Sequence, residues 1–143
     1  MRVQADIRIR RDIDAVFAYV ADPRRLPAWN SAVTDVQPAA GEPAGAEARY
    51  VMTRRLATGR ATNELLVAAV DAPVRFAIET TSGPTPFRYE YRFSEEHGTT
   101  TVALDARADL RHLGVLAPLA GRRLAGGIHA NLQTLRRLLE RGR

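Results

Sequence analysis

The end of the chain carries a long apolar stripe at helical spacing, and this stripe constrains the fold more than any other feature. From about Pro118 to Arg141 the apolar residues return every three or four positions, and at about 100° per residue they lie within roughly 40° of one line. The residues of the stripe are Gly121, Leu124, Ile128, Leu132, Leu135 and Leu139. A helix of about 24 residues is about 36 Å long, so its apolar face needs an equally extended apolar surface to cover it.

Most of the remaining chain alternates apolar and polar residues, which predicts strands with one buried face. The alternation is clearest over residues 87–94, and it already begins at residues 3–9. Five further strands are predicted at residues 32–36, 46–56, 60–70, 74–81 and 100–110. Because the turns between successive strands are short, these strands must pair antiparallel.

A short amphipathic helix follows the first strand. Asp12 is a good N-cap for it, and apolar residues recur at helical spacing until Asp22 and Pro23 end the helix. Residues 23–30 have room for one or two more helical turns. This order predicts one α+β domain over residues 1–143, in which a curved antiparallel sheet of about seven strands wraps around the long C-terminal helix.

The composition argues against several kinds of active site. The chain has no cysteine and no two of its three histidines are four residues apart, so we expect no metal and no cofactor. The net charge is +5, but all 21 basic residues are arginines spread along the chain, which favours a solvated surface over a nucleic-acid-binding face. No apolar leader begins the sequence and no run approaches the roughly 20 apolar residues of a membrane span, so a cytoplasmic protein is expected.

The order of elements and several short motifs resemble the START-like, helix-grip superfamily, which includes the polyketide cyclase/dehydrase and plant pollen-allergen groups. The most specific motif is Asp12–Trp29, which combines the helix start with the Asp22-Pro23 step. Supporting motifs are residues 67–73, 98–102 and 132–140. Such proteins enclose a cavity between the long helix and the concave sheet. The resemblance therefore implies that this chain binds a hydrophobic or amphipathic small molecule there.

The inward faces of the predicted strands and helix give a list of candidate ligand-binding residues. The apolar candidates are Met52, Leu65, Val67, Phe76, Ile78, Phe87, Leu104, Leu124 and Ile128. The polar candidates on these faces are Tyr50, Asn63, Thr80, Tyr89, Tyr91 and Asn131, with Arg54 near a strand end. Trp29 is expected near the mouth of the cavity, where it either contacts the ligand or only packs the short helices. A few polar groups in an apolar cleft suit an orienting ligand site.

Several of these side chains have two interpretations. Tyr89 and Tyr91 are either ligand contacts or core aromatic residues whose hydroxyls reach a partner or water. Asn131 bonds either a strand side chain or the ligand, and Asn63 is expected to meet ligand or a buried water. Arg54 is in phase with the inward residues of its strand. Solvation at the cavity rim is the main expectation for it, and binding of a carboxylate, phosphate or phenolate is the alternative.

Three functions remain open at this point, and no catalytic residue is assigned. The leading hypothesis is binding, and possibly transport, of a hydrophobic or amphipathic small molecule. Every predicted inward position lacks a carboxylate and an imidazole, which counts against general acid–base chemistry. The first alternative is a polyketide cyclase or dehydratase that acts by positioning and by hydrogen bonds from Tyr, Asn or Arg. The second is a regulator that binds a partner through its basic surface or a sheet edge.

Overall fold

The computed structural model describes residues 1–39, 47–56, 59–80 and 82–141 of the chain. The strands are β1 (Arg2–Ile9), β2 (Val33–Pro38), β3 (Arg49–Leu56), β4 (Gly59–Asp71), β5 (Arg75–Thr80), β6 (Phe87–Glu96) and β7 (Thr99–Ala108). The helices are α1 (Ile13–Val20), α2 (Leu26–Trp29) and α3 (Ala117–Arg141), and the two 3-10 turns are η1 (Pro23–Arg25) and η2 (Arg111–Leu116).

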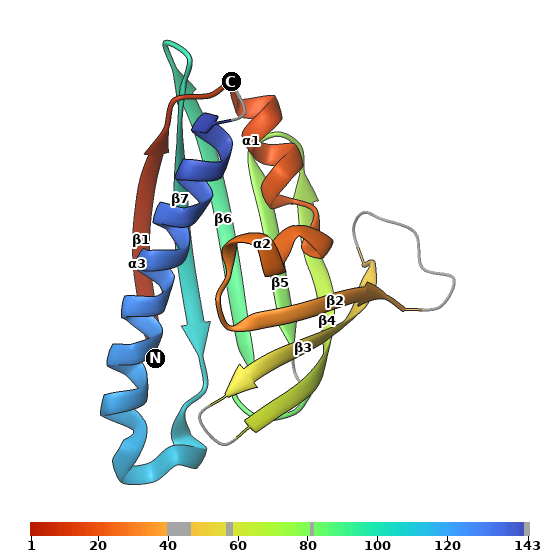
Figure 1. Cartoon of the computed structure of the whole chain (residues 1–143), viewed down its shortest axis with the longest axis vertical. Coiled ribbons are helices and arrows are strands. Elements are labelled where there is room, and N and C mark those ends of the chain that lie inside the picture. Colours follow the sequence, from red (N-terminus) through yellow and green to blue (C-terminus); the bar gives the residue numbers. More distant parts are fainter. Residues whose placement is uncertain (40–46, 57–58, 81, 142–143) are drawn as a thin grey trace.

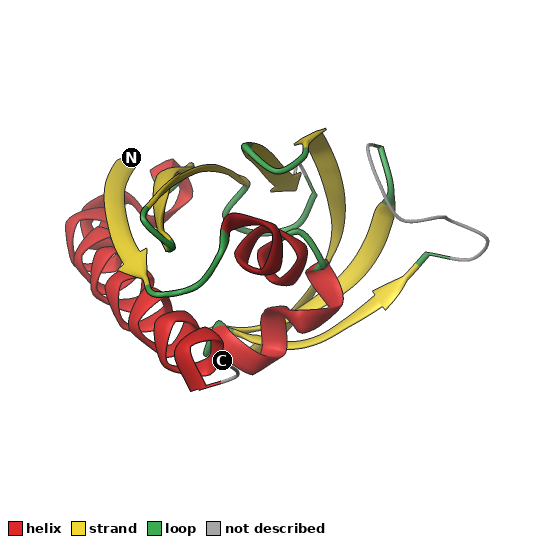
Figure 2. Cartoon of the chain, turned by 90° about the horizontal axis from the view of Figure 1, so that it is seen from above, coloured by secondary structure: helices red, strands yellow, loops and turns green. Residues whose placement is uncertain are grey.

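The strands form one seven-stranded antiparallel sheet in the order β1-β7-β6-β5-β4-β3-β2 (Figure 1). Strands β2 to β7 are neighbours in the order of the sequence. Strand β1 pairs with β7 at the other edge of the sheet, with Ile7 opposite Val102. Seen from above, the sheet bends around an interior that α3, α1 and α2 help to enclose (Figure 2). The predicted helix-grip architecture is therefore confirmed.

The stripe on α3 is buried as its spacing predicts. Ile128, Leu132, Leu135 and Leu139 are each at most 4% exposed, whereas Leu124, nearer the start of the helix, is only half-buried. Helix α3 packs on the edge strand β1 and also contacts α2. The helix thus contacts the sheet at its edge strand β1, and the buried apolar side chains of the stripe run from Ile128 to Leu139.

The short helix α1 begins where the sequence predicts. The carboxylate of Asp12 accepts a hydrogen bond from the backbone N–H of Ala15 at 3.1 Å, which caps the first turn. Phe17 on the buried face of α1 meets Phe93 of β6 edge to face, with ring centroids 5.1 Å apart. This contact fixes the helix on one end of the sheet.

The last predicted strand ends earlier than expected. It stops at Ala108, because the carboxylate of Asp109 accepts from the backbone N–H of Arg111 at 3.0 Å and turns the chain into η2, which the sequence did not predict. The predicted start of another strand at residue 46 and the predicted end of a third at residue 81 lie outside the described residues.

None of the described helices combines the length and the apolar character needed to cross a membrane.

Candidate functional site

The predicted inward residues do lie on one face of the sheet. Cross-strand partners share a face, and the register places Met52 opposite Asn63, and Ile78 opposite both Val67 and Tyr89. The buried members of the predicted set are Tyr50, Met52, Arg54, Asn63, Leu65, Val67, Phe76, Ile78, Thr80, Tyr91, Leu104, Ile128 and Trp29. The half-buried members are Phe87, Tyr89, Leu124 and Asn131. Whether they bind a ligand stays a prediction.

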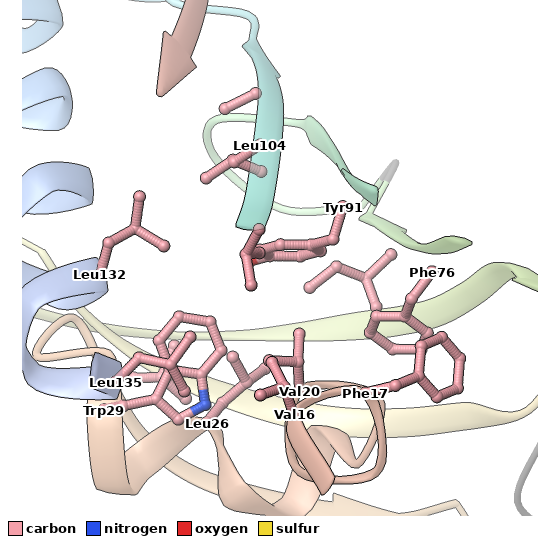
Figure 3. Close-up of a cluster of buried hydrophobic side chains, with 14 of the residues drawn as sticks. Val16, Phe17, Val20, Leu26, Trp29, Phe76, Tyr91, Leu104, Leu132 and Leu135 are labelled. Atoms are coloured by element: carbon pink, nitrogen blue, oxygen red, sulfur yellow. The ribbon is translucent and has the colours of Figure 1, made fainter. Parts of the chain in front are cut away.

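Aromatic side chains from three elements meet at the centre of this face. Tyr91 packs between Phe76, with which it stacks at 6.2 Å, and Trp29, which it meets edge to face at 6.2 Å. Side chains from α1, α2, α3 and the sheet point toward one another here (Figure 3). Trp29 is only 4% exposed, so it packs inside the molecule rather than at an open mouth.

The polar part of the interior is centred on Arg54. Its Nε donates to Oδ1 of Asn63 at 2.9 Å, and its Nη2 donates to the carbonyl oxygen of Pro84. Asn63 in turn donates from Nδ2 to the carbonyl oxygen of Ser82 at 2.5 Å. The guanidinium also lies over the ring of Phe87, 5.4 Å from its centroid, in a cation–π arrangement.

Every partner that holds Arg54 within the described residues is electrically neutral. Its contacts are an amide oxygen, a backbone carbonyl and an aromatic ring, and no carboxylate forms an ion pair with it there. Burial lowers the pKa of Arg54 below its usual value, because the charged form loses hydration. An arginine nevertheless stays protonated in a protein. The interior therefore holds a desolvated positive charge that an anion could neutralise.

The main expectation for Arg54, solvation at the cavity rim, is wrong. The residue is only 8% exposed, whereas its neighbour Arg55 is exposed. The reason is the segment 82–86, which leads from β5 to β6. It contacts Arg54 near the end of β3 and Asn63 near the start of β4. Its backbone carbonyls supply the acceptors that replace water.

Gly83 is the residue that lets this segment come so close. Its φ is 69°, and a Cβ atom built there would lie 2.0 Å from Nδ2 of Asn63. The sequence pattern identifies Ser82-Gly83-Pro84 only as a break between strands. The sequence does not predict that the carbonyl oxygens of Ser82 and Pro84 accept hydrogen bonds. The one signal of such partners is Asn63, an amide in the middle of a strand on its apolar face.

The tyrosines add neutral hydrogen-bond donors to the same face. Burial raises the pKa of Tyr89 to about 12, against a smaller opposing effect from the charge of Arg54. Burial also raises the pKa of Tyr91 well above its usual value. Within the described residues, neither hydroxyl forms a hydrogen bond. Both phenols are therefore neutral at pH 7, with their donor hydrogens not engaged by the described part of the chain.

Asn131 is engaged elsewhere than predicted. Its Oδ1 accepts from the backbone N–H of Ser31 at 3.2 Å and from the Ser31 hydroxyl at 3.4 Å, so it ties α3 to the loop after α2 rather than to a strand. The indole N–H of Trp29, in contrast, is buried and has no hydrogen-bond partner in the described chain. Such a group is rare in a folded interior, and it marks a place where a ligand atom could accept a hydrogen bond from the indole N–H.

Acidic and imidazole side chains are absent from the interior over the described ranges. The buried polar residues there are Arg54, Asn63, Thr80 and Thr100. The described residues also contain no group of three or more His, Cys, Asp or Glu side chains that could hold a metal ion. The chemistry available in the described part is thus orientation by donors and charge, not proton abstraction by a carboxylate or imidazole.

Comparison with known proteins gives one family and many similar folds. The family model described as polyketide cyclase / dehydrase and lipid transport matches residues 1–140. A START superfamily protein from Mycobacterium smegmatis is similar, with a TM-score of 0.78, 12% identity and 99% of each chain covered. A protein from Thermus thermophilus gives a TM-score of 0.79 at 16% identity, covering 96% of this chain and 95% of that one.

A protein from a biosynthetic pathway is among the similar structures. The di-domain ARO/CYC BexL from the BE-7585A biosynthetic pathway gives a TM-score of 0.73 at 19% identity, covering 98% of this chain and 50% of that one. At these identities the likeness establishes the fold alone. No curated protein matches the sequence.

Proposed function

The chain belongs to the polyketide cyclase/dehydrase and lipid transport family, and from this premise we propose that it binds an amphipathic small molecule between the sheet and α3. The inward face supports this proposal, since it is mostly apolar with a few polar groups. This composition is typical of sites that hold a hydrophobic molecule and fix its orientation.

The observation that carries the proposal is the buried, unneutralised charge of Arg54. A guanidinium already held by Asn63 and Pro84 is preorganised, and it loses little side-chain entropy when a ligand binds. A carboxylate, phosphate or phenolate group would supply the missing countercharge. The ligand we propose is therefore an apolar body with one anionic group, bound with that group toward Arg54.

The tyrosines and Trp29 extend this donor set. Tyr89 lies near Arg54, because the Phe87 ring contacts both: its centroid is 5.4 Å from the guanidinium and 4.8 Å from the centroid of the Tyr89 ring. A neutral phenol beside a guanidinium can donate to a second oxygen of the same anionic group. We assign the indole N–H of Trp29 to a polar atom elsewhere on the ligand, because it lacks a partner in the described chain.

A cyclase is the second candidate, and the same donors favour it. Arg54 and Tyr89 form a donor pair that could stabilise an oxyanion, which is how a site without a carboxylate base can favour ring closure. Binding remains the first candidate, because the described interior offers no group to remove a proton from carbon.

The test begins with native mass spectrometry of freshly purified protein and organic extraction of any bound molecule. Binding is then compared for dodecanoate and dodecanol, which share a chain and differ in charge. Trp29 is the only tryptophan, so its fluorescence reports on binding directly. We expect the wild type to prefer dodecanoate by about tenfold or more, as for a charge-assisted hydrogen bond.

The matched variants are Arg54→Gln and Arg55→Gln, which remove the same charge from the inner and outer faces of β3. Arg54→Gln should abolish the preference for the acid, and Arg55→Gln should keep it. Equal binding of acid and alcohol by the wild type would contradict the role of Arg54. If nothing co-purifies and neither compound binds, the proposed function itself is wrong.

A further inference from the structure

Exposed apolar side chains gather at one end of the molecule, where η2 leads into α3. The structure exposes six large apolar side chains in its described part, and three of them lie here. Val115 is 95% exposed, Leu116 is 59% exposed and Leu119 is 57% exposed. We name these three residues the η2–α3 tip. The turn η2 and the start of α3 lie at the lower left of the molecule in Figure 1.

The local backbone explains why these side chains project outward. Gly114 has φ 55° and ψ −122°, a non-helical conformation that kinks the chain inside η2, and Val115 and Leu116 after this kink are both exposed. Leu119 stands nine residues before the buried Ile128, which at about 100° per residue places it on the opposite side of the helix. The Met1 side chain lies against Gly121 on the buried side of α3, so it is not part of the tip.

The sequence around the tip carries basic side chains, and the nearest carboxylate before it in sequence, that of Asp109, is paired with Arg111. No acidic residue occurs between Asp109 and Glu140. Arg122 and Arg123 follow Leu119 by three and four positions, so they lie beside it on the helix surface, and both are exposed. Neither forms an ion pair with any described residue. The tip is an apolar surface bordered by free cations.

We propose that the η2–α3 tip docks on the surface of an anionic membrane. The apolar side chains would enter the interface between head groups and acyl chains, and Arg122 and Arg123 would lie among the lipid phosphates. Peripheral membrane helices combine these two features, an apolar side and a border of basic residues. Neither feature serves the fold, because the apolar side chains are exposed and the two arginines pair with no carboxylate in the described chain.

The start of η2, just before the tip, lies next to the polar end of the interior. The hydroxyl of Thr85 is 3.5 Å from Nε2 of His112 in η2, and the backbone N–H of Asp109 donates to the carbonyl oxygen of Pro86 at 2.8 Å. Thr85 and Pro86 belong to the segment 82–86 that covers Arg54. Docking would bring the anion-binding end of the interior to the lipid surface. This last link rests on the proposed function, and the docking itself does not.

The experiment is co-sedimentation of the full chain with two kinds of vesicle. One kind is phosphatidylcholine alone, and the other is an equal mixture of phosphatidylcholine and phosphatidylglycerol. We expect the protein to bind the anionic vesicles, and we expect added salt to weaken this binding. Binding to the neutral vesicles should be at least about tenfold weaker. Failure of the wild type to bind either vesicle would overturn the proposal.

Two variants separate the apolar and the charged contributions. We expect Val115→Ser with Leu116→Ser and Leu119→Ser to lose about tenfold in binding to the anionic vesicles, and Arg122→Gln with Arg123→Gln to lose as much. The matched controls are Arg136→Gln with Arg137→Gln, farther along α3, and Val51→Ser with Val74→Ser, which are exposed elsewhere. An equal loss in the arginine control would mean general attraction to positive charge, and an equal loss in the valine control would mean that any exposed apolar side chain contributes. Either result would overturn the proposal.

Two other occupants of the tip would be recognised in the same experiments. Binding of duplex DNA that needs Arg122 and Arg123 but tolerates the triple serine variant, without vesicle binding, would identify a nucleic-acid surface instead. A dimer in sedimentation velocity that the triple serine variant dissociates would identify an interface between two copies, again overturning the proposal. Arg54→Gln should still dock, which keeps failure of docking distinct from failure of ligand binding.

Discussion

At the scale of single residues, the burial of Arg54 depends on a loop far from it in sequence. The carbonyl that accepts from its guanidinium lies 30 residues away, in the segment 82–86. Alternation along β3 predicts that Arg54 faces inward, but no local pattern predicts that Pro84 covers it. The alternation of residues in β3 thus predicts that the Arg54 side chain points inward. It does not predict the neutral hydrogen-bond partners that surround the guanidinium.

Gly83→Ala tests this covering segment. A non-glycine residue at φ 69° costs roughly 1–2 kcal/mol, and the added Cβ would also clash with Nδ2 of Asn63. We expect the free energy of unfolding to fall by about 2 kcal/mol or more in urea denaturation. The control is Gly126→Ala, an exposed helical site with free space, which should gain about 0.5–1 kcal/mol. A neutral Gly83→Ala would mean that the segment does not hold Asn63.

Tyr89→Phe tests whether the phenol serves the protein or the ligand. The hydroxyl has no hydrogen-bond partner in the described chain, so its removal should change the free energy of unfolding by less than about 0.5 kcal/mol. Binding of dodecanoate should weaken severalfold. A loss of stability above about 1 kcal/mol without ligand would reveal a structural hydrogen bond instead.

At the scale of elements, the strands and helices followed from periodicity, and their ends did not always do so. Helix α3 and the inward faces of β3 to β7 appear where the spacing of apolar residues places them. The turn η2 was missed, because it arises from one carboxylate, that of Asp109, capturing a backbone N–H. Such a capture is a single contact and leaves no repeating signal.

Leu132→Ala tests the register of α3. The side chain is 2% exposed near the centre of the stripe, and its truncation should cost about 2–5 kcal/mol in the free energy of unfolding. Leu119→Ala on the outward side of the same helix should cost less than about 0.5 kcal/mol. Denaturation curves of the two variants measure the difference. Equal costs would mean that the helix is rotated from the position described here.

At the scale of the whole molecule, ionisable groups limit stability at both extremes of pH. The Arg75 guanidinium lowers the pKa of Glu90, and Arg2 lowers that of Asp105. Carboxyls with a lowered folded pKa contribute stability above their unfolded pKa of about 4, and this contribution is lost as the pH falls through the folded values. Burial raises the pKa of Tyr89 to about 12, so its contribution is lost as the pH rises above about 10.

We therefore expect the urea midpoint to be level between about pH 6 and 9, and to fall below about pH 4 and above about pH 10. The acidic decline should be modest, because the Arg2–Asp105 pair is largely exposed to water and the Arg75–Glu90 pair is partly exposed. Tyr89→Phe should reduce the alkaline decline and leave the acidic one unchanged. If the urea midpoint of Tyr89→Phe falls above about pH 10 as steeply as that of the wild type, another group causes the loss of stability.

The pairing of β1 with β7 has a consequence for how the chain is made. Among the described strands β1 leaves the ribosome first, yet β7, the strand with which it pairs, leaves last, since Arg2 pairs with Arg107. Until then β1 has no neighbouring strand, and α3, which also packs on it, has not been synthesised. Contacts between such distant segments form slowly and leave strand edges open in the meantime. The pairing of β1 can form only after strands β2 to β7 have all been synthesised, so the sheet is completed late and not by adding each strand to the one before it.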